Sequence, residues 1–270
     1  MNLEEYFLNM FEIDTKNLAE SLKQAKEEMD KLGDNVNLII RHLLNDSLNK
    51  KEVIEICHAG KFITVLGDKI QIKKKTEAPD FIIEYNGKEI GLEVERILNP
   101  HEVQNIKSKQ ELFEKAAKEF ESKFPSVKLL ANFWLQDGFR FKGNQKNMLT
   151  KEIVNFIHEL ASGNNPPYPI YIENVDLMSH SGVSFNFNEG AYMLSDLPTA
   201  NLLEAITKKE AKVENYKINS GLDSHWLLLV SGIGSESFNI EDVELPQKIE
   251  SQFEHIYLLE DFDAKVTKIK

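Results

Sequence analysis

Alternation of hydrophobic and polar positions over residues 79–96 predicts a β-hairpin. Asn86-Gly87 lies between the two alternating runs, and both residue types accept the positive φ angles of a type I′ turn. A two-residue loop fixes the register, so we expect Tyr85 opposite Lys88 and Phe81 opposite Leu92. Directly opposed residues share a face, so one face is apolar and the other acidic. The acidic face carries Asp80, Glu84, Glu89, Glu93 and Glu95, with Ile82 and Gly91 between them.

The rest of the chain alternates between helical and extended patterns. Apolar residues recur at helical spacing, which predicts helices at 2–12, 15–33, 35–44, 50–58, 101–123, 147–161 and 198–217. Short apolar runs predict strands at 62–66, 69–74, 127–135, 168–175, 183–187, 226–230 and 255–260. The run WLLLV at 226–230 is continuously apolar, as expected for a strand covered on both faces.

This order of elements predicts an α/β fold, a mixed β-sheet flanked by helices. The helical patterns near the start predict an N-terminal helical region at residues 1–49, followed by one α/β domain at 50–270. The N-terminal helices are a candidate surface for a homodimer or a protein partner.

Composition narrows the class of protein. With 41% hydrophobic and 28% charged residues, the chain has an ordinary globular composition. No apolar run approaches the ~20 residues of a membrane span, so no membrane association is expected. The single cysteine, Cys57, excludes an intramolecular disulfide. The acidic N-terminus lacks the features of a secretion signal, and a cytoplasmic location is expected.

The net charge of −12 argues against a nucleic-acid partner, because binding to phosphates relies on clustered Lys and Arg. The distribution weakens that objection, since residues 50–75 hold seven Lys against three acids. The total charge therefore does not decide between an enzyme that acts on nucleic acid and a protein-binding module.

The acidic face of the hairpin is the main candidate site. Opposed like charges destabilise a sheet unless water screens them or a divalent cation lies between them. Asp80, Glu93 and Glu95 are expected to converge on a volume the size of a metal site. The alternative is a half-buried hairpin whose acids point into water. Gly91, opposite Ile82, suggests close approach by another element.

Pro79-Asp80, a gap of twelve residues and Glu93-Val94-Glu95 lie across a hairpin with a helix before it and a helix and a strand after it. This arrangement resembles the PD-(D/E)xK nuclease superfamily, whose fold is restriction-endonuclease-like, over roughly residues 50–135. The resemblance implies Mg²⁺, with Mn²⁺ as a substitute, held by Asp80, Glu93 and the carbonyl of Val94. Glu95 stands where the motif has Lys, and would act as an auxiliary ligand or base.

Further candidates surround this core. Glu52 and Glu55, on the preceding helix, are either additional metal ligands or surface charges. Lys209, Lys212 and Tyr216 form one stripe of a helix, as a phosphate-binding surface or as exposed residues. Candidate phosphate contacts are Lys73, Lys74, Lys107, Lys109, Arg140 and Lys142.

We therefore expect a Mg²⁺-dependent endonuclease that hydrolyses phosphodiester bonds, with DNA preferred to RNA. The alternative function is a catalytically inactive nuclease-fold module. Such a module would bind a protein partner, or act as a subunit of a larger nucleic-acid-processing or defence complex.

Overall fold

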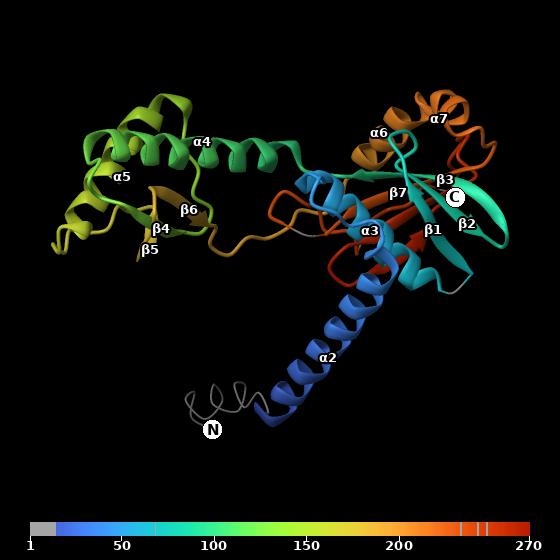
Figure 1. Ribbon diagram of the computed structural model, residues 1–270, viewed down its shortest axis with the longest axis horizontal. Coiled ribbons are helices and arrows are strands. Elements are labelled where there is room, and N and C mark those ends of the chain that lie inside the picture. Colours follow the sequence, from blue (N-terminus) through green and yellow to red (C-terminus); the bar gives the residue numbers. More distant parts are fainter. Residues whose placement is uncertain (1–14, 68, 233, 242, 247) are drawn as a thin grey trace, which may run out of the picture. The chain divides into compact units, whose positions relative to one another are not determined.

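The computed structural model describes residues 15–67, 69–232, 234–241, 243–246 and 248–270 (Figure 1). The helix expected at 2–12 lies outside these residues. The chain forms two compact units, whose limits differ from the boundary expected after residue 49. The first unit runs up to Ile97 and resumes with Pro198–Ser231 and Val243–Lys270. The second comprises Leu98–Leu197 and Gly232–Asp242.

The first unit contains a six-stranded sheet in the order β1-β2-β3-β7-β8-β9. Its strands are β1 (Ile70–Lys75), β2 (Phe81–Tyr85), β3 (Lys88–Arg96), β7 (His225–Ser231), β8 (His255–Glu260) and β9 (Lys265–Lys268). Strands β1, β2 and β3 pair antiparallel, β3, β7 and β8 pair parallel, and β9 is antiparallel to β8. The predicted α/β architecture with a mixed sheet is confirmed. Strand β9 was not predicted, and it forms one edge of the sheet, next to β8.

Helices cover both faces of this sheet (Figure 1). They are α3 (Lys50–Leu66), α6 (Thr199–Glu210) and α7 (Val213–Ser220), whereas α2 (Thr15–Ile40) extends away from the sheet and joins the core through Val36 and Ile40 near its C-terminal end. Helix α3 packs on the face that carries Phe81, Leu92 and Leu228, where these residues form one buried core. Helices α6 and α7 cover the opposite face, toward which Glu93 and Glu95 point.

Helix boundaries differ from the sequence prediction in three places. Helix α2 continues to Ile40 without the expected interruption, and the single helix expected at 198–217 is broken after Glu210. Helix α3 begins at an Asn49–Glu52 capping box and continues through 62–66, where a strand was expected. That prediction was wrong because Phe62 and Ile63 lie three and four residues after Ala59 and are buried in the same core. The helix ends only at Gly67, with φ 84°.

The hairpin has the predicted register. Tyr85 lies opposite Lys88, Ile82 opposite Gly91 and Phe81 opposite Leu92. Asn86 and Gly87 both have positive φ, as a type I′ turn requires. The close approach expected at Gly91 is also present, because a Cβ atom there would lie 2.8 Å from Nε2 of His225 on β7.

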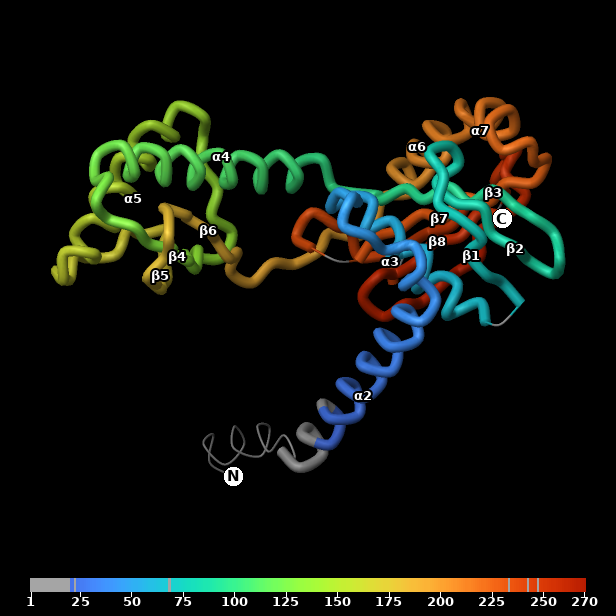
Figure 2. Tube along the Cα trace, viewed as in Figure 1, coloured from blue at the N-terminus to red at the C-terminus, as the bar shows by residue number. Residues whose placement is uncertain are grey.

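The second unit has its own sheet, in the order β5-β4-β6, and its own core (Figure 2, green to yellow). Its elements are α4 (Pro100–Lys123), β4 (Leu129–Leu135), the 3₁₀ helix η1 (Gly143–Gln145), α5 (Lys146–Ala161), β5 (Ile172–Ser179) and β6 (Ser184–Asn188). Strand β4 pairs antiparallel with β5 and parallel with β6. All were predicted except η1, although β5 lies later than the expected 168–175.

In the sequence, most of the second unit lies between β3 and β7, which are neighbouring strands of the first sheet. The helix and strand that follow the hairpin in sequence, α4 and β4, belong to the second unit. The strand that pairs with β3 is β7, and the helices that precede it are α6 and α7. Within the first unit, residues from α6 onward therefore complete the surroundings of the acidic face.

Candidate functional site

Asp80 and Glu93 meet at the end of the hairpin that lies away from its turn. Asp80 directly precedes β2, and its backbone N–H donates to Oε2 of Glu93 at 3.3 Å. The N–H of Val94 donates to Oδ2 of Asp80 at 2.8 Å. Glu93 is only 5% exposed, so its carboxylate does not point into water as the solvent-exposed alternative required.

Lys209 of α6 supplies an ammonium group to these acids. Its Nζ atom lies 2.6 Å from Oε1 of Glu93 and 3.0 Å from Oε2 of Glu95. The side chain is buried, whereas Lys212, which lies between α6 and α7 rather than on the stripe expected from the sequence, is exposed. The neighbouring Lys208 Nζ atom lies 2.5 Å from Oε1 of Glu95. Glu95 thus pairs with two lysines, both of which come from α6.

Sequence reasoning singled out Lys209 without assigning it to the carboxylates. The signal that places it there is the spacing of the buried positions on α6 and α7. Leu202, Ile206, Lys209, Val213 and Tyr216 are all buried and recur at steps of three and four. A lysine in an apolar stripe is expected to need a buried partner.

The charges at this site reinforce one another. Burial lowers the pKa of Lys209, but attraction to Glu93 and hydrogen bonds to Glu93 and Glu95 outweigh it and raise the pKa above its ordinary value. Burial raises the pKa of Glu95, but hydrogen bonds from Lys208 and Lys209 outweigh it, so the pKa is lowered. Lys209 is therefore charged, and Glu95 is ionised at neutral pH.

Asp80 is different. Burial and the nearby charges of Glu93 and Glu55 raise its pKa from 3.8 to about 7, against the opposing effect of the Val94 N–H. The site thus holds negative charge that Lys209 does not fully offset at Asp80. Such a position favours a further cation.

Glu55 and Glu52 of α3 have different environments. Glu55 is buried, close enough to Asp80 to affect its pKa, and paired with Lys51 at 3.2 Å. Glu52 caps the N-terminus of α3 and pairs with Lys75 at 3.1 Å. Only Glu55 is therefore placed to contribute to the site.

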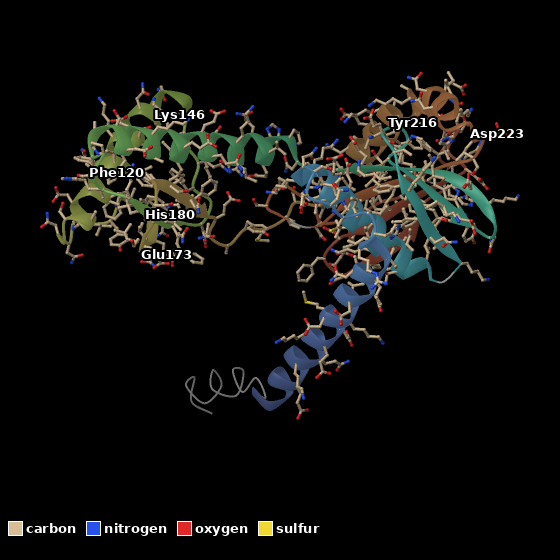
Figure 3. The ribbon with its side chains drawn as sticks, viewed as in Figure 1. Phe120, Lys146, Glu173, His180, Tyr216 and Asp223 are labelled. Carbon is tan, nitrogen blue, oxygen red and sulfur yellow. The ribbon has the colours of Figure 1, made fainter. Side chains whose placement is uncertain are left out.

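Tyr216 of α7, labelled in Figure 3, lies close enough to the acids for their charges to affect its pKa. It is 2% exposed, and its hydroxyl interacts with the Glu93 carboxylate. Burial, the charges of Glu93, Asp80 and Glu95, and a hydrogen bond to Glu93 raise its pKa, so the hydroxyl keeps its proton.

The other candidate phosphate contacts have different partners or are exposed. Lys109, in the second unit, is buried with its Nζ atom 2.6 Å from Glu189, and Arg140 is paired with Glu102. Lys73 pairs with Glu84 at 2.9 Å. The remaining candidates, Lys74, Lys107 and Lys142, are exposed. Lys209 and Lys208 are the lysines that contact Glu93 or Glu95 among the described residues.

The metal-ligating groups at this site suit Mg²⁺ better than a metal ion whose ligands all come from the protein. Among the described residues, no group of three or more His, Cys, Asp or Glu is arranged to hold a metal ion. Mg²⁺ typically takes one or two carboxylates and completes its shell with water and substrate phosphate. Asp80 and Glu93 supply two carboxylates. The Val94 backbone lies beside these carboxylates, since its N–H donates to Oδ2 of Asp80.

Comparisons with protein-family models, curated proteins and solved structures find no match to this chain. The structure itself defines an α/β protein with mixed sheets. Within the described part of the chain, no helix has the length and apolar character needed to cross a membrane.

Proposed function

We propose that the first unit is a Mg²⁺-dependent nuclease with a restriction-endonuclease-like core, which hydrolyses phosphodiester bonds in DNA in preference to RNA. The contact between Lys209 and Glu93, at 2.6 Å, is the observation that carries the proposal. In the proposed site, Lys209 of α6 would supply the ammonium group that the Lys of the motif supplies, because Glu95 stands at the position of that Lys.

Each residue has a distinct role in the proposed reaction. Asp80 and Glu93, with the Val94 carbonyl, would hold Mg²⁺, for which Mn²⁺ would substitute. The ion lowers the pKa of a bound water and neutralises charge on the phosphate. Lys209 would place positive charge next to the scissile phosphate, and Glu95 would hold Lys209 in position. The Tyr216 hydroxyl would donate to a phosphate oxygen.

Cleavage assays with the whole chain test this proposal. Asp80→Asn and Lys209→Met are each expected to lower Mg²⁺-dependent cleavage of DNA by at least about 100-fold, the scale of losing one electrostatic contact in a reaction. Lys212→Met is the matched control, since Lys212 is an exposed lysine three residues further along, between α6 and α7. Full activity in Asp80→Asn would reject the proposal. The same assay with an RNA substrate measures the expected preference for DNA over RNA.

One observation favours the inactive module instead. Lys209 already partly neutralises Glu93 and Glu95, and the raised pKa of Asp80 lets it bind a proton near pH 7. The site can therefore reach low net charge without a metal. Calorimetric titration of Mn²⁺ into the wild type and Asp80→Asn separates the two functions. Binding that the substitution abolishes supports the nuclease, and no binding to either protein supports the module.

A further inference from the structure

Strand β6 forms one edge of the sheet in the second unit. Its inner edge pairs with β4, and no strand in the described part of the chain pairs with its outer edge. An edge strand presents unpaired N–H and C=O groups, which are a template for a further strand.

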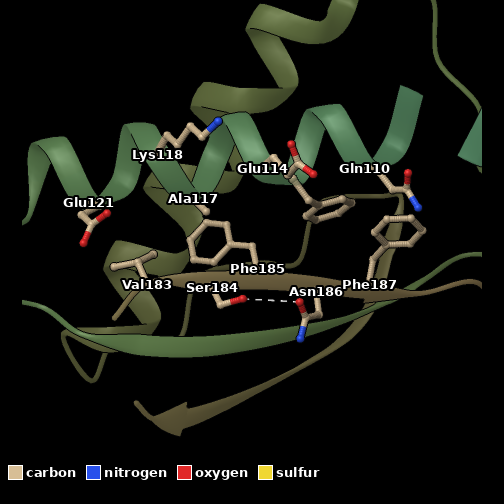
Figure 4. A pocket seen from close by; sticks show the side chains of 11 residues that line it. Gln110, Glu114, Ala117, Lys118, Glu121, Val183, Ser184, Phe185, Asn186 and Phe187 are labelled. Carbon is tan, nitrogen blue, oxygen red and sulfur yellow. Dashed lines mark hydrogen bonds between the residues drawn. The ribbon is translucent and has the colours of Figure 1, made fainter. Parts of the chain in front are cut away.

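A cavity of about 930 Å³ follows this outer edge, between β6 and α4 (Figure 4). Its β6 wall consists of consecutive residues, 183–187, rather than alternate ones. Alternate residues of a strand point to opposite faces, so a wall of consecutive residues means that the cavity runs along the backbone edge. On the α4 side, its wall includes Glu114, Ala117 and Lys118. The cavity has the position that an added strand would occupy.

The sequence of β6, SFNFN, is complementary to itself in an antiparallel pair. Phe185 and Phe187 point toward α4, and Ser184 and Asn186 point to the other side (Figure 4). A pair centred on Asn186 would place Phe185 opposite Phe187 of the other strand, and Asn186 opposite itself. Aromatic pairs across strands stabilise sheets, and this arrangement brings no like charges together.

The other edge of the same sheet is protected. Strand β5 carries the exposed acids Glu173 and Asp176, whereas β6 has no charged residue and no proline. Charges and prolines are the usual means of preventing edge-to-edge pairing. Their absence from β6 favours an edge that is meant to be paired.

We propose that β6 pairs antiparallel with β6 of a second copy of this chain, about a two-fold axis at Asn186. The two three-stranded sheets would form one continuous sheet, and the interface would be the same patch on both copies. This inference does not depend on the nuclease proposal.

The test is the dimer dissociation constant of the whole chain, from sedimentation velocity over a concentration series. The wild type is expected to dimerise. Asn186→Lys, whose exposed side chain would meet its own copy at the axis, is expected to weaken dimerisation by about tenfold or more. Asn186→Asp is expected to act in the same way. An equimolar mixture of the two variants is expected to restore dimerisation, because opposite charges then meet.

Asn174→Lys on β5 is the matched control, an exposed asparagine at the protected edge, and is expected to leave dimerisation unchanged. Circular dichroism and the melting temperature of each variant verify that it folds. A monomeric wild type would overturn the proposal and leave the edge to a different partner. An unchanged dimer in Asn186→Lys, or no recovery in the mixture, would also overturn it.

Discussion

Lys209 determines the charge balance of the candidate site. Its ammonium group is buried between two carboxylates, so its loss leaves Glu93 buried without a positive partner. Removal of one member of a buried ion pair typically costs about 3–5 kcal/mol. We expect Lys209→Met to lower the free energy of unfolding by about 3 kcal/mol, measured by urea denaturation.

The control for this prediction is Lys212→Met, which removes the same group from an exposed position. It is expected to change the stability by less than about 0.5 kcal/mol. Equal effects of the two substitutions would contradict the role assigned to Lys209.

Asp80 predicts a pH dependence of stability. Its pKa is about 7 in the folded protein and lies near its ordinary value of 3.8 after unfolding. Between these values the folded state binds more protons, so the contribution of Asp80 to the free energy of unfolding decreases as pH rises from about 4 to about 7. Asp80→Asn removes this contribution, and is expected to be more stable than the wild type at pH 8 by up to about 4 kcal/mol.

Thermal unfolding of both proteins across this pH range is the measurement. The difference in melting temperature should grow as pH rises and level off above about pH 7. A difference that is independent of pH would show that Asp80 has an ordinary pKa.

The residues of the site could be predicted only in part. Asp80 and Glu93 were expected to meet because the turn at Asn86-Gly87 fixes their register locally. Lys209 could not be assigned to them, because it lies more than a hundred residues later and its contact depends on how α6 packs. Only its place among buried apolar positions pointed to a partner.

At the scale of elements, the contact between β3 and β7 is unusually close at Gly91. A Cβ atom there would lie 2.8 Å from both His225 Nε2 and Pro79 Cγ, too near for either to remain in place. Gly91→Ala is therefore expected to destabilise the protein by about 1–3 kcal/mol, as overpacked side chains do. Chemical denaturation measures this loss.

The same substitution at Gly33 is the control. Gly33 lies in α2, and a Cβ atom added there would meet nothing within 4 Å. Because alanine is the better helix former, Gly33→Ala is expected to stabilise the protein by about 0.5–1 kcal/mol. If Gly91→Ala and Gly33→Ala both stabilised the protein, or both destabilised it, the close approach at Gly91 would not explain the effect of adding a side chain there.

Element predictions succeeded where local signals agreed and failed where packing overrode them. The hairpin and α4 follow their sequence patterns. Residues 62–66 contain the β-branched residues Ile63, Thr64 and Val65, which favour a strand. They are helical because Phe62 and Ile63 complete the buried face of α3, a tertiary effect that no local window contains.

For the whole molecule, two separate cores predict two unfolding transitions. Leu228 lies in the core of the first unit and Phe133 in that of the second. Leu228→Ala and Phe133→Ala, each expected to cost about 3 kcal/mol or more, should shift different transitions in a urea titration. A single transition shifted equally by both would show that the units unfold together.

The same urea titration, carried out with and without Mn²⁺, also tests metal binding. If Asp80 and Glu93 bind Mn²⁺, the ion should stabilise the transition that Leu228→Ala shifts, because a ligand stabilises the unit that binds it. The transition shifted by Phe133→Ala should not respond.

The division into two units could not be read from the sequence. Residues 98–197 show the same alternation of helices and strands as the rest of the chain, without a linker of distinctive composition. The pattern therefore predicted the class of fold and most elements correctly. It could not show that β3 pairs with β7 rather than with a strand that follows sooner.

The pairing of β3 with β7 has a consequence for synthesis on the ribosome. When β3 emerges, the strand that will lie beside it is still more than a hundred residues from being made. At about 5–20 residues per second, β3 waits on the order of ten seconds with one edge uncovered. The intervening residues 98–197 can acquire their own core during that time. A nascent chain of this protein therefore needs something to cover the unpaired edge of β3 until β7 (His225–Ser231) has been synthesised.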